Sequence, residues 1–374
     1  MSNIKVIAFY LPQFHAIPEN DKSYGKGFTE WTNVKKAKPL FEGHNQPRVP
    51  LNQRYYDLLE PGVMRDQANL AKKYGVYGFC YYHYWFEKGK KLLEKPLEMM
   101  LADKSVDIPY CICWANENWT RRWDGGNNEI IVEQNYGDRD NITKHAQYLA
   151  QYFKDERYIK EDGRPLLLIY KPELIIHCRK YINALRNEIK KQGFDVKIGF
   201  QFPDAILFGD YLKYCDFYVE FQPTFTQKLM IKEQRNKLNN AAHRIYWSSA
   251  TSFIRNNLKR RRVVSKLQVL NYDQAWECIL KHKVVSEKAV AGAFVDWDNT
   301  PRKVNGIVYK DASPEKFGVY LSLLFKKIHS EYNSTNLFIN AWNEWGEGAY
   351  LEPDERNAYG YLEEIQKALE NDDN

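Results

Sequence analysis

Two glutamates, Glu344 and Glu347, stand three residues apart directly after the apolar run 337–339. Two tryptophans and two asparagines surround them in the segment Asn340-Ala341-Trp342-Asn343-Glu344-Trp345-Gly346-Glu347-Gly348. In a pair of carboxyl groups, one can give a proton to a leaving oxygen while the other acts as a base or a nucleophile. Flat indole faces suit the apolar faces of pyranose rings. The pair therefore indicates a site that cuts or moves a sugar, although by itself it is equally consistent with a strand end whose glutamates face water.

The rest of the chain must position this pair, and it alternates strand-like and helix-like runs from end to end. Strands are predicted at 6–11, 77–82, 109–114, 166–170, 197–202, 217–221, 291–295 and 336–342. Helices are predicted at 62–74, 92–101, 143–153, 174–190, 274–282, 314–328 and 359–370. Gly75 is a suitable residue to end the first helix. About eight β–α pairs in one pass predict an α/β fold of the (β/α)8 TIM-barrel type. No glycine-rich phosphate fingerprint follows any strand, which disfavours a nucleotide fold.

We expect a single (β/α)8 catalytic domain with long βα loops across residues 1–374, because no repeat, low-complexity segment or linker divides the chain. Two parts lie outside the regular rhythm, an irregular basic insertion at about 224–270 and an acidic C-terminal tail at 369–374. The insertion contains the run Lys259-Arg260-Arg261-Arg262. This run is either a solvated face, which we favour, or a patch for phosphates or an anionic membrane surface.

Composition narrows the class of protein. The formal net charge of +6 is a mild excess for 374 residues, so we expect no nucleic-acid partner. The aromatic fraction of 15% exceeds what a core usually requires, and surplus Tyr and Trp mark recognition surfaces. Cys111-Ile112-Cys113 has a poor spacing for zinc, and we expect neither metal nor cofactor. No signal peptide or membrane-length apolar run is evident, so a cytoplasmic protein is expected, with peripheral inner-membrane contact through the basic run as a hypothesis.

In a (β/α)8 barrel the chemistry sits at the C-terminal ends of the strands. Nearly every predicted strand brings there an aromatic residue together with an amide, a carboxylate or a histidine. The candidate substrate-binding residues are Tyr10, His15, Tyr82, His83, Trp85, Trp114, Asn116, Glu117, Gln222, Asp296, Trp297, Asn343 and Trp345. A convergent pocket with these contents fits a carbohydrate better than a metal or a nucleotide.

Some of these residues have a second interpretation. Glu117 is a candidate for catalysis or for holding a sugar hydroxyl, but it can equally pair with Arg121 or Arg122. Asp296 is either an acid or a loop anchor, and the D-x-D spacing of Asp296 and Asp298 is a weak match to a nucleotide-sugar motif. For His15 and His83, hydrogen bonding is favoured over metal binding, since no metal motif accompanies them.

Five motifs in order resemble the WbsX-type family of bacterial polysaccharide-biosynthesis proteins, described as glycosyltransferases and grouped with glycoside hydrolase family 99-like domains. The motifs are Phe9-Tyr10-Leu11-Pro12-Gln13-Phe14-His15, Gly27-Phe28-Thr29-Glu30-Trp31, Tyr81-Tyr82-His83-Tyr84-Trp85, Trp114-Ala115-Asn116-Glu117-Asn118-Trp119 and Trp342-Asn343-Glu344-Trp345-Gly346-Glu347-Gly348. The similarity covers residues 6 to about 360.

The resemblance implies a (β/α)8 enzyme related to endo-acting α-mannosidases and mannanases. In those hydrolases the last strand ends in Asn-Glu-Trp-x-Glu-Gly and a further Glu follows, here Glu352, which joins the substrate-binding candidates. By resemblance, Glu344 removes the proton of the sugar 2-hydroxyl to give an epoxide-like intermediate, and Glu347 acts as acid and then base. Glu347 should then hold its proton well above the ordinary Glu range while Glu344 stays the better base.

The resemblance also implies a retaining enzyme of surface-polysaccharide metabolism (O-antigen or capsule). Its expected substrate is an oligo- or polysaccharide, and a lipid-linked glycan is one candidate. Hydrolysis and transfer both remain open. Two alternatives are a glycan-binding barrel that has lost its chemistry and a nucleotide-sugar-dependent glycosyltransferase. The presence of both glutamates argues against the first, and the weak D-x-D match argues against the second.

Overall fold

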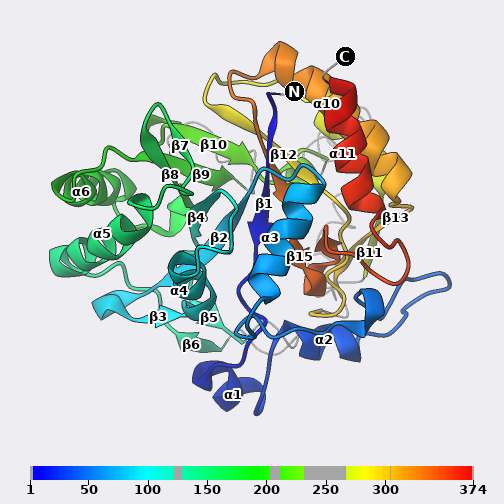
Figure 1. The fold of residues 1–374 in the computed structure, drawn as a ribbon, viewed down its shortest axis with the longest axis horizontal. Coiled ribbons are helices and arrows are strands. Elements are labelled where there is room, and N and C mark those ends of the chain that lie inside the picture. Colours follow the sequence, from blue (N-terminus) through cyan, green and yellow to red (C-terminus); the bar gives the residue numbers. More distant parts are fainter. Residues whose placement is uncertain (1–2, 122–128, 203–210, 231–266, 304, 373–374) are drawn as a thin grey trace, which may run out of the picture.

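The computed structural model describes residues 3–121, 129–202, 211–230, 267–303 and 305–372, and these form a closed barrel of eight parallel strands (Figure 1). The barrel strands are β1 (Lys5–Tyr10), β2 (Gly78–Trp85), β4 (Tyr110–Trp114), β8 (Arg164–Ile169), β9 (Lys197–Phe202), β10 (Phe217–Glu220), β12 (Ala289–Phe294) and β14 (Asn336–Asn340). They pair in this order around the barrel, and β1 closes it by pairing with both β2 and β14. The predicted (β/α)8 barrel is confirmed.

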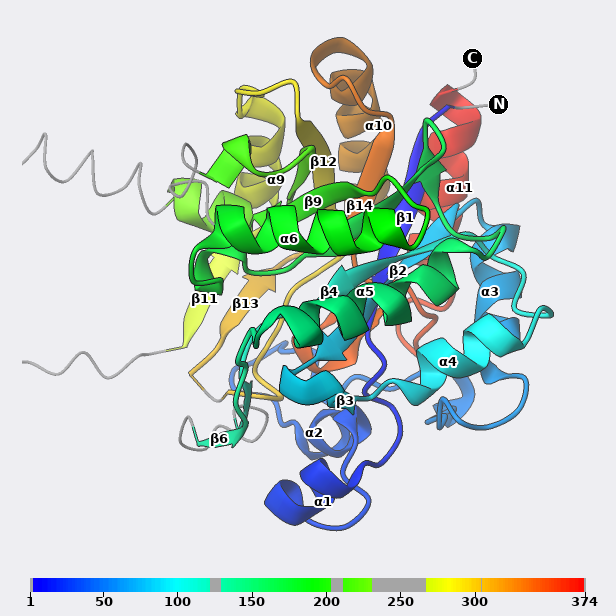
Figure 2. The ribbon, with the colours of Figure 1, turned by 90° about the vertical axis from the view of Figure 1, so that its left-hand side faces the viewer.

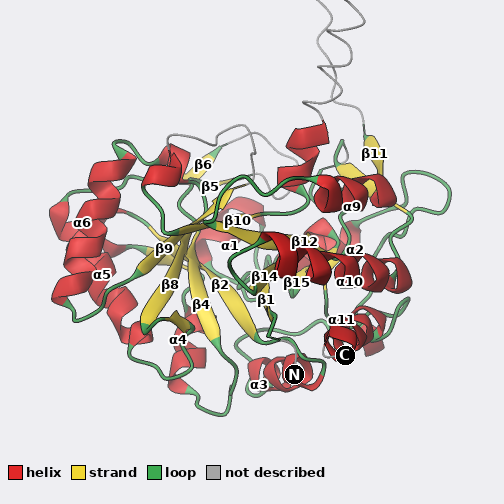
Figure 3. Cartoon of the chain, turned by 90° about the horizontal axis from the view of Figure 1, so that it is seen from above, coloured by secondary structure: helices red, strands yellow, loops and turns green. Residues whose placement is uncertain are grey.

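Helices cover the outside of the barrel, as the view from above shows (Figure 3). They are α3 (Val63–Lys73), α4 (Lys95–Ala102), α5 (Arg139–Phe153), α6 (Cys178–Lys191), α9 (Tyr272–Lys281), α10 (Pro314–Glu331) and α11 (Gly360–Asp372). Helices α5 and α6 run side by side along one flank, seen in Figure 2. No helix in the described ranges has the length and apolar character to cross a membrane.

Short elements lie in the loops and beside the barrel strands. They are α1 (Pro18–Tyr24), α2 (Glu30–Lys36), β3 (Lys91–Leu92), β5 (Trp119–Thr120), β6 (Ile130–Val132), β7 (Lys160–Glu161), β11 (Gln268–Asn271), β13 (Ile307–Lys310), β15 (Asn343–Glu344) and β16 (Ala349–Tyr350), with the 3₁₀ turns η1 (Leu51–Gln53), η2 (Glu87–Gly89), η3 (Pro172–Leu174), η4 (Tyr211–Lys213) and η5 (Trp345–Glu347). The sequence predicted only a long polar loop through residue 52, whereas the structure places α1, α2 and η1 there. Residues 231–266 of the expected basic insertion, including Lys259, Arg260, Arg261 and Arg262, lie outside the described residues.

Local sequence explains where the covering helices begin and end. Asp138 accepts a hydrogen bond from the backbone N–H of Asn141 at the start of α5. Ser313 does the same for the N–H of Lys316 at the start of α10, where Pro314 occupies the first turn. Helix α3 ends before Gly75, which has a φ of 81°. This left-handed conformation suits glycine, so the predicted stop at Gly75 is confirmed.

Aromatic rings fill the barrel interior. Phe9 of β1 stacks on Tyr82 of β2 with ring centroids 5.6 Å apart. Its other neighbours are Phe221, at 5.3 Å, and Phe338, at 5.6 Å. Strand alternation directs residues of the opposite parity outward, under the helices. The interior is thus a packed floor, and the cavity described below lies above it, at the strand C-terminal ends.

Two histidines meet in the layer between β2 and α5. The Nε2 atoms of His83 and His145 are 3.1 Å apart, and both rings are buried. Burial lowers the pKa of His83 to about 3 and lowers the pKa of His145 as well, since the charged form of each is desolvated. Both imidazoles are therefore neutral in the folded protein at pH 7.

This pair predicts acid sensitivity. Between pH 6.5 and 3 the unfolded chain binds protons at these histidines that the folded protein does not, so the free energy of unfolding falls as pH falls. Each imidazole contributes up to about 1.4 kcal/mol per pH unit. His145→Phe should give a shallower fall in thermal midpoint between pH 6.5 and 4.5. His177→Asn, at an exposed histidine that precedes α6, should keep the wild-type slope. Equal slopes in all three proteins would contradict the prediction.

Candidate active site

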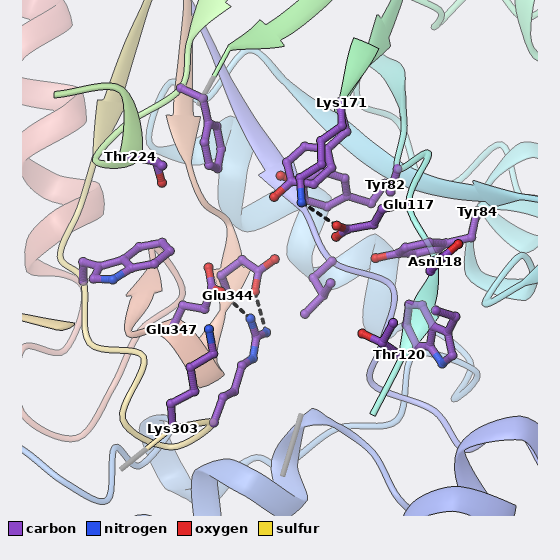
Figure 4. A pocket seen from close by; sticks show the side chains of 17 residues that line it. Tyr82, Tyr84, Glu117, Asn118, Thr120, Lys171, Thr224, Lys303, Glu344 and Glu347 are labelled. Atoms are coloured by element: carbon purple, nitrogen blue, oxygen red, sulfur yellow. Dashed lines mark hydrogen bonds and ion pairs between the residues drawn. The ribbon is translucent and has the colours of Figure 1, made fainter. Parts of the chain in front are cut away.

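The strand C-terminal ends surround a cavity of about 240 Å³. Its lining residues are Leu11, Tyr82, Tyr84, Ala115, Glu117, Asn118, Trp119, Thr120, Tyr170, Lys171, Phe221, Thr224, Trp297, Arg302, Lys303, Glu344 and Glu347. These come from the ends of seven barrel strands, all except β9, and the loops that follow them. In Figure 4, Glu117 and Lys171 face one another on one side of the cavity, and Lys303 lies on the side of Glu344 and Glu347.

Both predicted catalytic glutamates line this cavity. Glu344 belongs to β15, Glu347 to η5, and a tight turn through Gly348 returns the chain to β16. Asn343 anchors the segment, because its side chain accepts a hydrogen bond from the Leu11 N–H at 2.7 Å and donates one to the Leu11 carbonyl at 3.0 Å. The loop carrying the two carboxyls is thereby tied to the end of β1.

One guanidinium contacts both glutamates. The Nη2 atom of Arg302 is 2.8 Å from Glu344 Oε2, and its Nη1 atom is 2.6 Å from Glu347 Oε1. The Nε atom lies 2.8 Å from Glu30 Oε1, on the side away from the cavity. Arg302, Glu30 and Glu344 are buried, whereas the Glu347 side chain is 23% exposed. Three carboxyl groups thus share one cation.

Burial and the surrounding charges change the pKa of Glu344. Burial raises the pKa of Glu344 to about 8, reinforced by the carboxylates of Glu347 and Glu30 and opposed by Arg302. Glu344 was expected to be the better base of the pair and so to stay ionised, whereas burial favours its protonated form. The ionised form of such a carboxyl is a strong proton acceptor, and its population increases as pH rises toward 8.

A second ion pair occupies the facing wall. Glu117 pairs with Lys171 across the ends of β4 and β8, and not with Arg121. Asn116 holds the two strand ends together, since its side chain accepts from the Lys171 N–H at 2.7 Å and donates to the Lys171 carbonyl at 2.7 Å. Arg122, the other partner considered, lies outside the described residues.

Of the predicted binding residues, Tyr82, Glu117 and Trp297 line the cavity. Further rings in its walls come from Tyr84, Trp119, Tyr170 and Phe221, which the sequence did not single out as site residues. Tyr84 lies two residues after Tyr82 on β2, and alternate residues of a strand face the same side. This alternation is the sequence signal that could have identified Tyr84 as a cavity residue. Arg302 and Lys303 come from the loop after β12, where no sequence periodicity marks them.

Four other predicted residues point away from the cavity because of strand alternation. His83 and Trp85 of β2 pack beneath α5, where Trp85 stacks on His145 with ring centroids 4.7 Å apart. Trp114 contacts the same histidine at 4.9 Å. Tyr10 is fully buried and donates a hydrogen bond to Gln67 of α3. These side chains join the barrel to its helices.

The remaining candidates are buried around the cavity without lining it. His15 contacts the Pro12 carbonyl at 3.0 Å through Nδ1, and Gln222 accepts from the Thr226 N–H at 3.2 Å. Trp345 donates to Glu352 at 2.6 Å. Tyr56 and Gln67 also donate to this carboxyl, and burial raises its pKa to about 7. Asn116 and Asn343 have the strand-anchoring contacts given above. Together these residues support the strand ends from behind.

The Asp296 and Asp298 pair is engaged with its own surroundings. Asp296 lies 2.7 Å from Arg48, and Asp298 accepts hydrogen bonds from Gln46 at 2.6 Å and from the Thr300 hydroxyl at 2.6 Å. Asp298 is fully buried. Both carboxylates therefore act as loop anchors here. Across the described ranges, no three His, Cys, Asp or Glu side chains come together as a metal site would require.

The fold is shared with solved carbohydrate enzymes. The glycoside hydrolase family 99 endo-α-mannosidase from Bacteroides thetaiotaomicron in complex with bis-tris-propane superposes with a TM-score of 0.58 at 13% identity, covering 98% of this chain and 97% of that one. A structure described as a glycoside hydrolase-like protein gives 0.58 at 12% identity, covering 99% and 94%. These likenesses show that the barrel fold is shared with those proteins.

Sequence comparison gives the family. The family model described as glycosyltransferase WbsX matches residues 6–365. The uncharacterized protein WxcX of Xanthomonas campestris pv. campestris is 37% identical over 372 residues, 97% of this chain and 49% of the relative. This chain therefore spans about half the length of that curated relative. Fold and sequence together define a (β/α)8-barrel protein related to glycosyltransferase WbsX. The chain belongs to the glycosyltransferase WbsX family.

The raised pKa of Glu344 predicts a stability change with pH. Between pH 4.5 and 8 the folded protein holds a proton on Glu344 that the unfolded chain has lost, so the free energy of unfolding falls as pH rises through this window. Glu344→Gln removes this contribution, up to about 1.4 kcal/mol per pH unit. Its thermal midpoint should decline less between pH 5 and 8 than that of wild type. Glu355→Gln, at an exposed glutamate nearby, is the control. A decline as steep in Glu344→Gln as in wild type would refute the assignment.

Proposed function

We propose that this chain is a carbohydrate-active enzyme that cleaves or transfers a glycosidic bond with the Glu344 and Glu347 pair. The observation that supports this most is the placement of both carboxyls at the end of β14, side by side on Arg302, in a cavity walled by aromatic rings. Rings such as Trp297 and Tyr82 offer stacking faces, and Glu117 and Lys171 offer hydrogen bonds to hydroxyls. A pocket of this composition suits a sugar.

The proposed first step breaks the glycosidic bond. Ionised Glu344 takes the proton of the sugar 2-hydroxyl while O2 attacks C1, and Glu347 gives a proton to the departing oxygen. In the second step, Glu347 takes a proton from the incoming water or sugar hydroxyl, whose oxygen attacks C1. The epoxide-like ring opens and Glu344 returns its proton to O2. Two inversions at C1 give net retention.

The positions of the two carboxyls support a retaining course. Oxygens of both glutamates contact the two terminal nitrogens of a single guanidinium, which holds the carboxyls close together. Both carboxyls can therefore act at one glycosidic bond, and retention follows from the two displacements at C1, in which the sugar O2 is the first nucleophile. An enzyme that transfers a sugar to an acceptor and keeps its anomeric configuration is likewise a retaining enzyme.

The substrate proposed is an oligo- or polysaccharide, mannose-configured by analogy with the endo-α-mannosidase of the same fold. The WbsX description of the family supports a role in bacterial surface polysaccharide, O-antigen or capsule, with a lipid-linked glycan as a candidate substrate. A cytoplasmic enzyme at the inner membrane surface fits this role. The chain is proposed to act as a single catalytic domain.

The chemical proposal predicts that either Glu344→Gln or Glu347→Gln lowers turnover by at least about 10²-fold, because each removes one proton-transfer group. The assay uses α-mannosyl fluoride and a panel of α-mannose-containing oligosaccharides, with ¹H NMR to follow the anomeric configuration of the first product. Glu355→Gln should retain wild-type turnover.

Near-normal turnover by either cavity variant would reject the assignment. Binding of the oligosaccharides by wild type without any turnover, with or without an added sugar acceptor, would instead identify a glycan-binding barrel. Dependence on a nucleotide sugar would identify the alternative donor class.

The membrane proposal has its own test. Basic residues near an anionic surface contribute about 1 kcal/mol each, an attraction that weakens as salt rises. Wild type should sediment weakly with anionic vesicles at low salt and less at high salt. A protein with Lys259, Arg260, Arg261 and Arg262 changed to Ser should lose this binding. Equal, negligible binding by both proteins would favour a solvated basic face.

A further inference from the structure

The segment Gly27-Phe28-Thr29-Glu30-Trp31 has no part in the proposed reaction, yet it lies directly behind the carboxyl pair. Glu30 opens helix α2, its side chain is fully buried, and its backbone N–H donates to the Gln13 carbonyl at 3.0 Å. Trp31 packs on Trp345 of the catalytic segment with ring centroids 5.3 Å apart. Helix α2 is thus packed against η5.

A buried carboxylate requires a partner, and Glu30 has Arg302. Their Oε1 and Nε atoms are 2.8 Å apart. The guanidinium is planar, so fixing its Nε edge also fixes the directions of its two terminal nitrogens. Those nitrogens carry the contacts to Glu344 and Glu347 at 2.8 and 2.6 Å. Glu30 therefore orients the group that holds both reacting carboxyls.

Gly346 shows how closely α2 approaches the catalytic segment. A Cβ added at this glycine would overlap the Glu30 carboxylate and would lie 2.9 Å from Arg302 Nε. Gly346 separates the two glutamates in the sequence, between Trp345 and Glu347. Only a residue without a side chain lets a carboxylate sit against the backbone at this point.

We propose that Glu30 and Arg302 are positioning residues, in which Glu30 orients the Arg302 guanidinium and the guanidinium holds one oxygen of Glu344 and one of Glu347. The other oxygen of each glutamate is then available to the substrate. This assignment rests on the proposed function for its catalytic meaning, whereas its electrostatic consequence holds for the folded protein alone.

The two positioning residues act on Glu344 with opposite sign. The charged and titratable groups near its carboxyl are Arg302, Glu347, Glu30 and the tyrosines Tyr82, Tyr84 and Tyr170. Among them Arg302 lowers the pKa of Glu344, and Glu30 and Glu347 raise it. A residue that only fills space would not produce opposite shifts on removal of the two charges.

The decisive measurement is the titration of Glu344 by ¹³C NMR in protein labelled at the glutamate carboxyl carbons, with the signal assigned by its loss in Glu344→Gln. Arg302→Met should move the titration midpoint up by at least about one pH unit, since an adjacent cation shifts a carboxyl by about 1–3 units. Glu30→Gln should move it down. Arg302→Lys, which keeps the charge, should stay nearer to wild type and covers the case in which Arg302→Met does not fold.

A matched control is Arg157→Lys. Arg157 is a largely buried arginine that pairs with Asp155 at 2.7 Å, and it does not line the cavity. This variant should lower thermal stability and leave the Glu344 midpoint unchanged. Gly346→Ala should displace the Glu30 carboxylate and move the midpoint in the same direction as Glu30→Gln. A Glu344 midpoint that is the same in wild type, in Glu30→Gln and in folded Arg302→Met would overturn the proposal; if Arg302→Met does not fold, equal midpoints in wild type, Glu30→Gln and Gly346→Ala would do so.

Turnover gives an independent readout. Arg302→Lys should lower kcat by at least about tenfold with a smaller change in KM, because one ammonium cannot hold two carboxyls in the geometry of a guanidinium. The acidic limb of the kcat profile, where activity rises as Glu344 loses its proton, should shift in the direction of the NMR midpoint. If Glu344→Gln retains turnover while the NMR shifts appear as expected, the proposed function fails and the positioning assignment stands as electrostatics. If turnover is lost in Glu344→Gln but the midpoint does not move, the positioning assignment fails alone.

Discussion

The active cavity depends on one cation shared among three carboxyl groups. Arg302 is buried, and a buried charge is stable only when paired. Its three partners come from the loop after β1 and the turn after β14, while Arg302 itself follows β12. The ion-pair cluster therefore does two things at once. It holds three loops together at the barrel end. It also contains more negative groups than positive ones, and this excess adds to the effect of burial, which shifts Glu344 toward its protonated form.

Strand parity determines which side chains reach that cluster. On β2, Tyr82 and Tyr84 face the barrel axis and the cavity, while His83 and Trp85 lie against α5. The same segment of sequence thus supplies both a cavity wall and the packing of the helical layer. Aromatic residues serve in both places because a ring can stack on a sugar or on another ring. Their high number in this chain reflects the two demands together.

The sequence predicted the features that depend on hydrophobic periodicity or on residues that are neighbours in the chain. All eight barrel strands and the catalytic segment after the last one were identifiable, because apolar runs and short motifs are local signals. Contacts between distant loops were not. Nothing in the sequence pairs Glu30 with Arg302, which are separated by 272 positions, or shows that Glu117 selects Lys171 over Arg121. Nearness to a strand end wrongly assigned four residues to the pocket, because the alternation of side chains along a strand was not taken into account. They are Tyr10, His83, Trp85 and Trp114.

The closure of the barrel by β1 has a consequence for synthesis. Strand β1 pairs with β14, and Leu11 contacts Asn343 through two hydrogen bonds. Within the barrel, the first strand to be synthesised can therefore complete its pairing only after the last barrel strand has emerged. Until then Glu30 remains hydrated and the edge of β1 stays unpaired, so an incomplete chain has no assembled cluster and no reactive carboxyl pair. The ion-pair cluster therefore assembles only when the barrel closes, as a contact between segments far apart in the sequence.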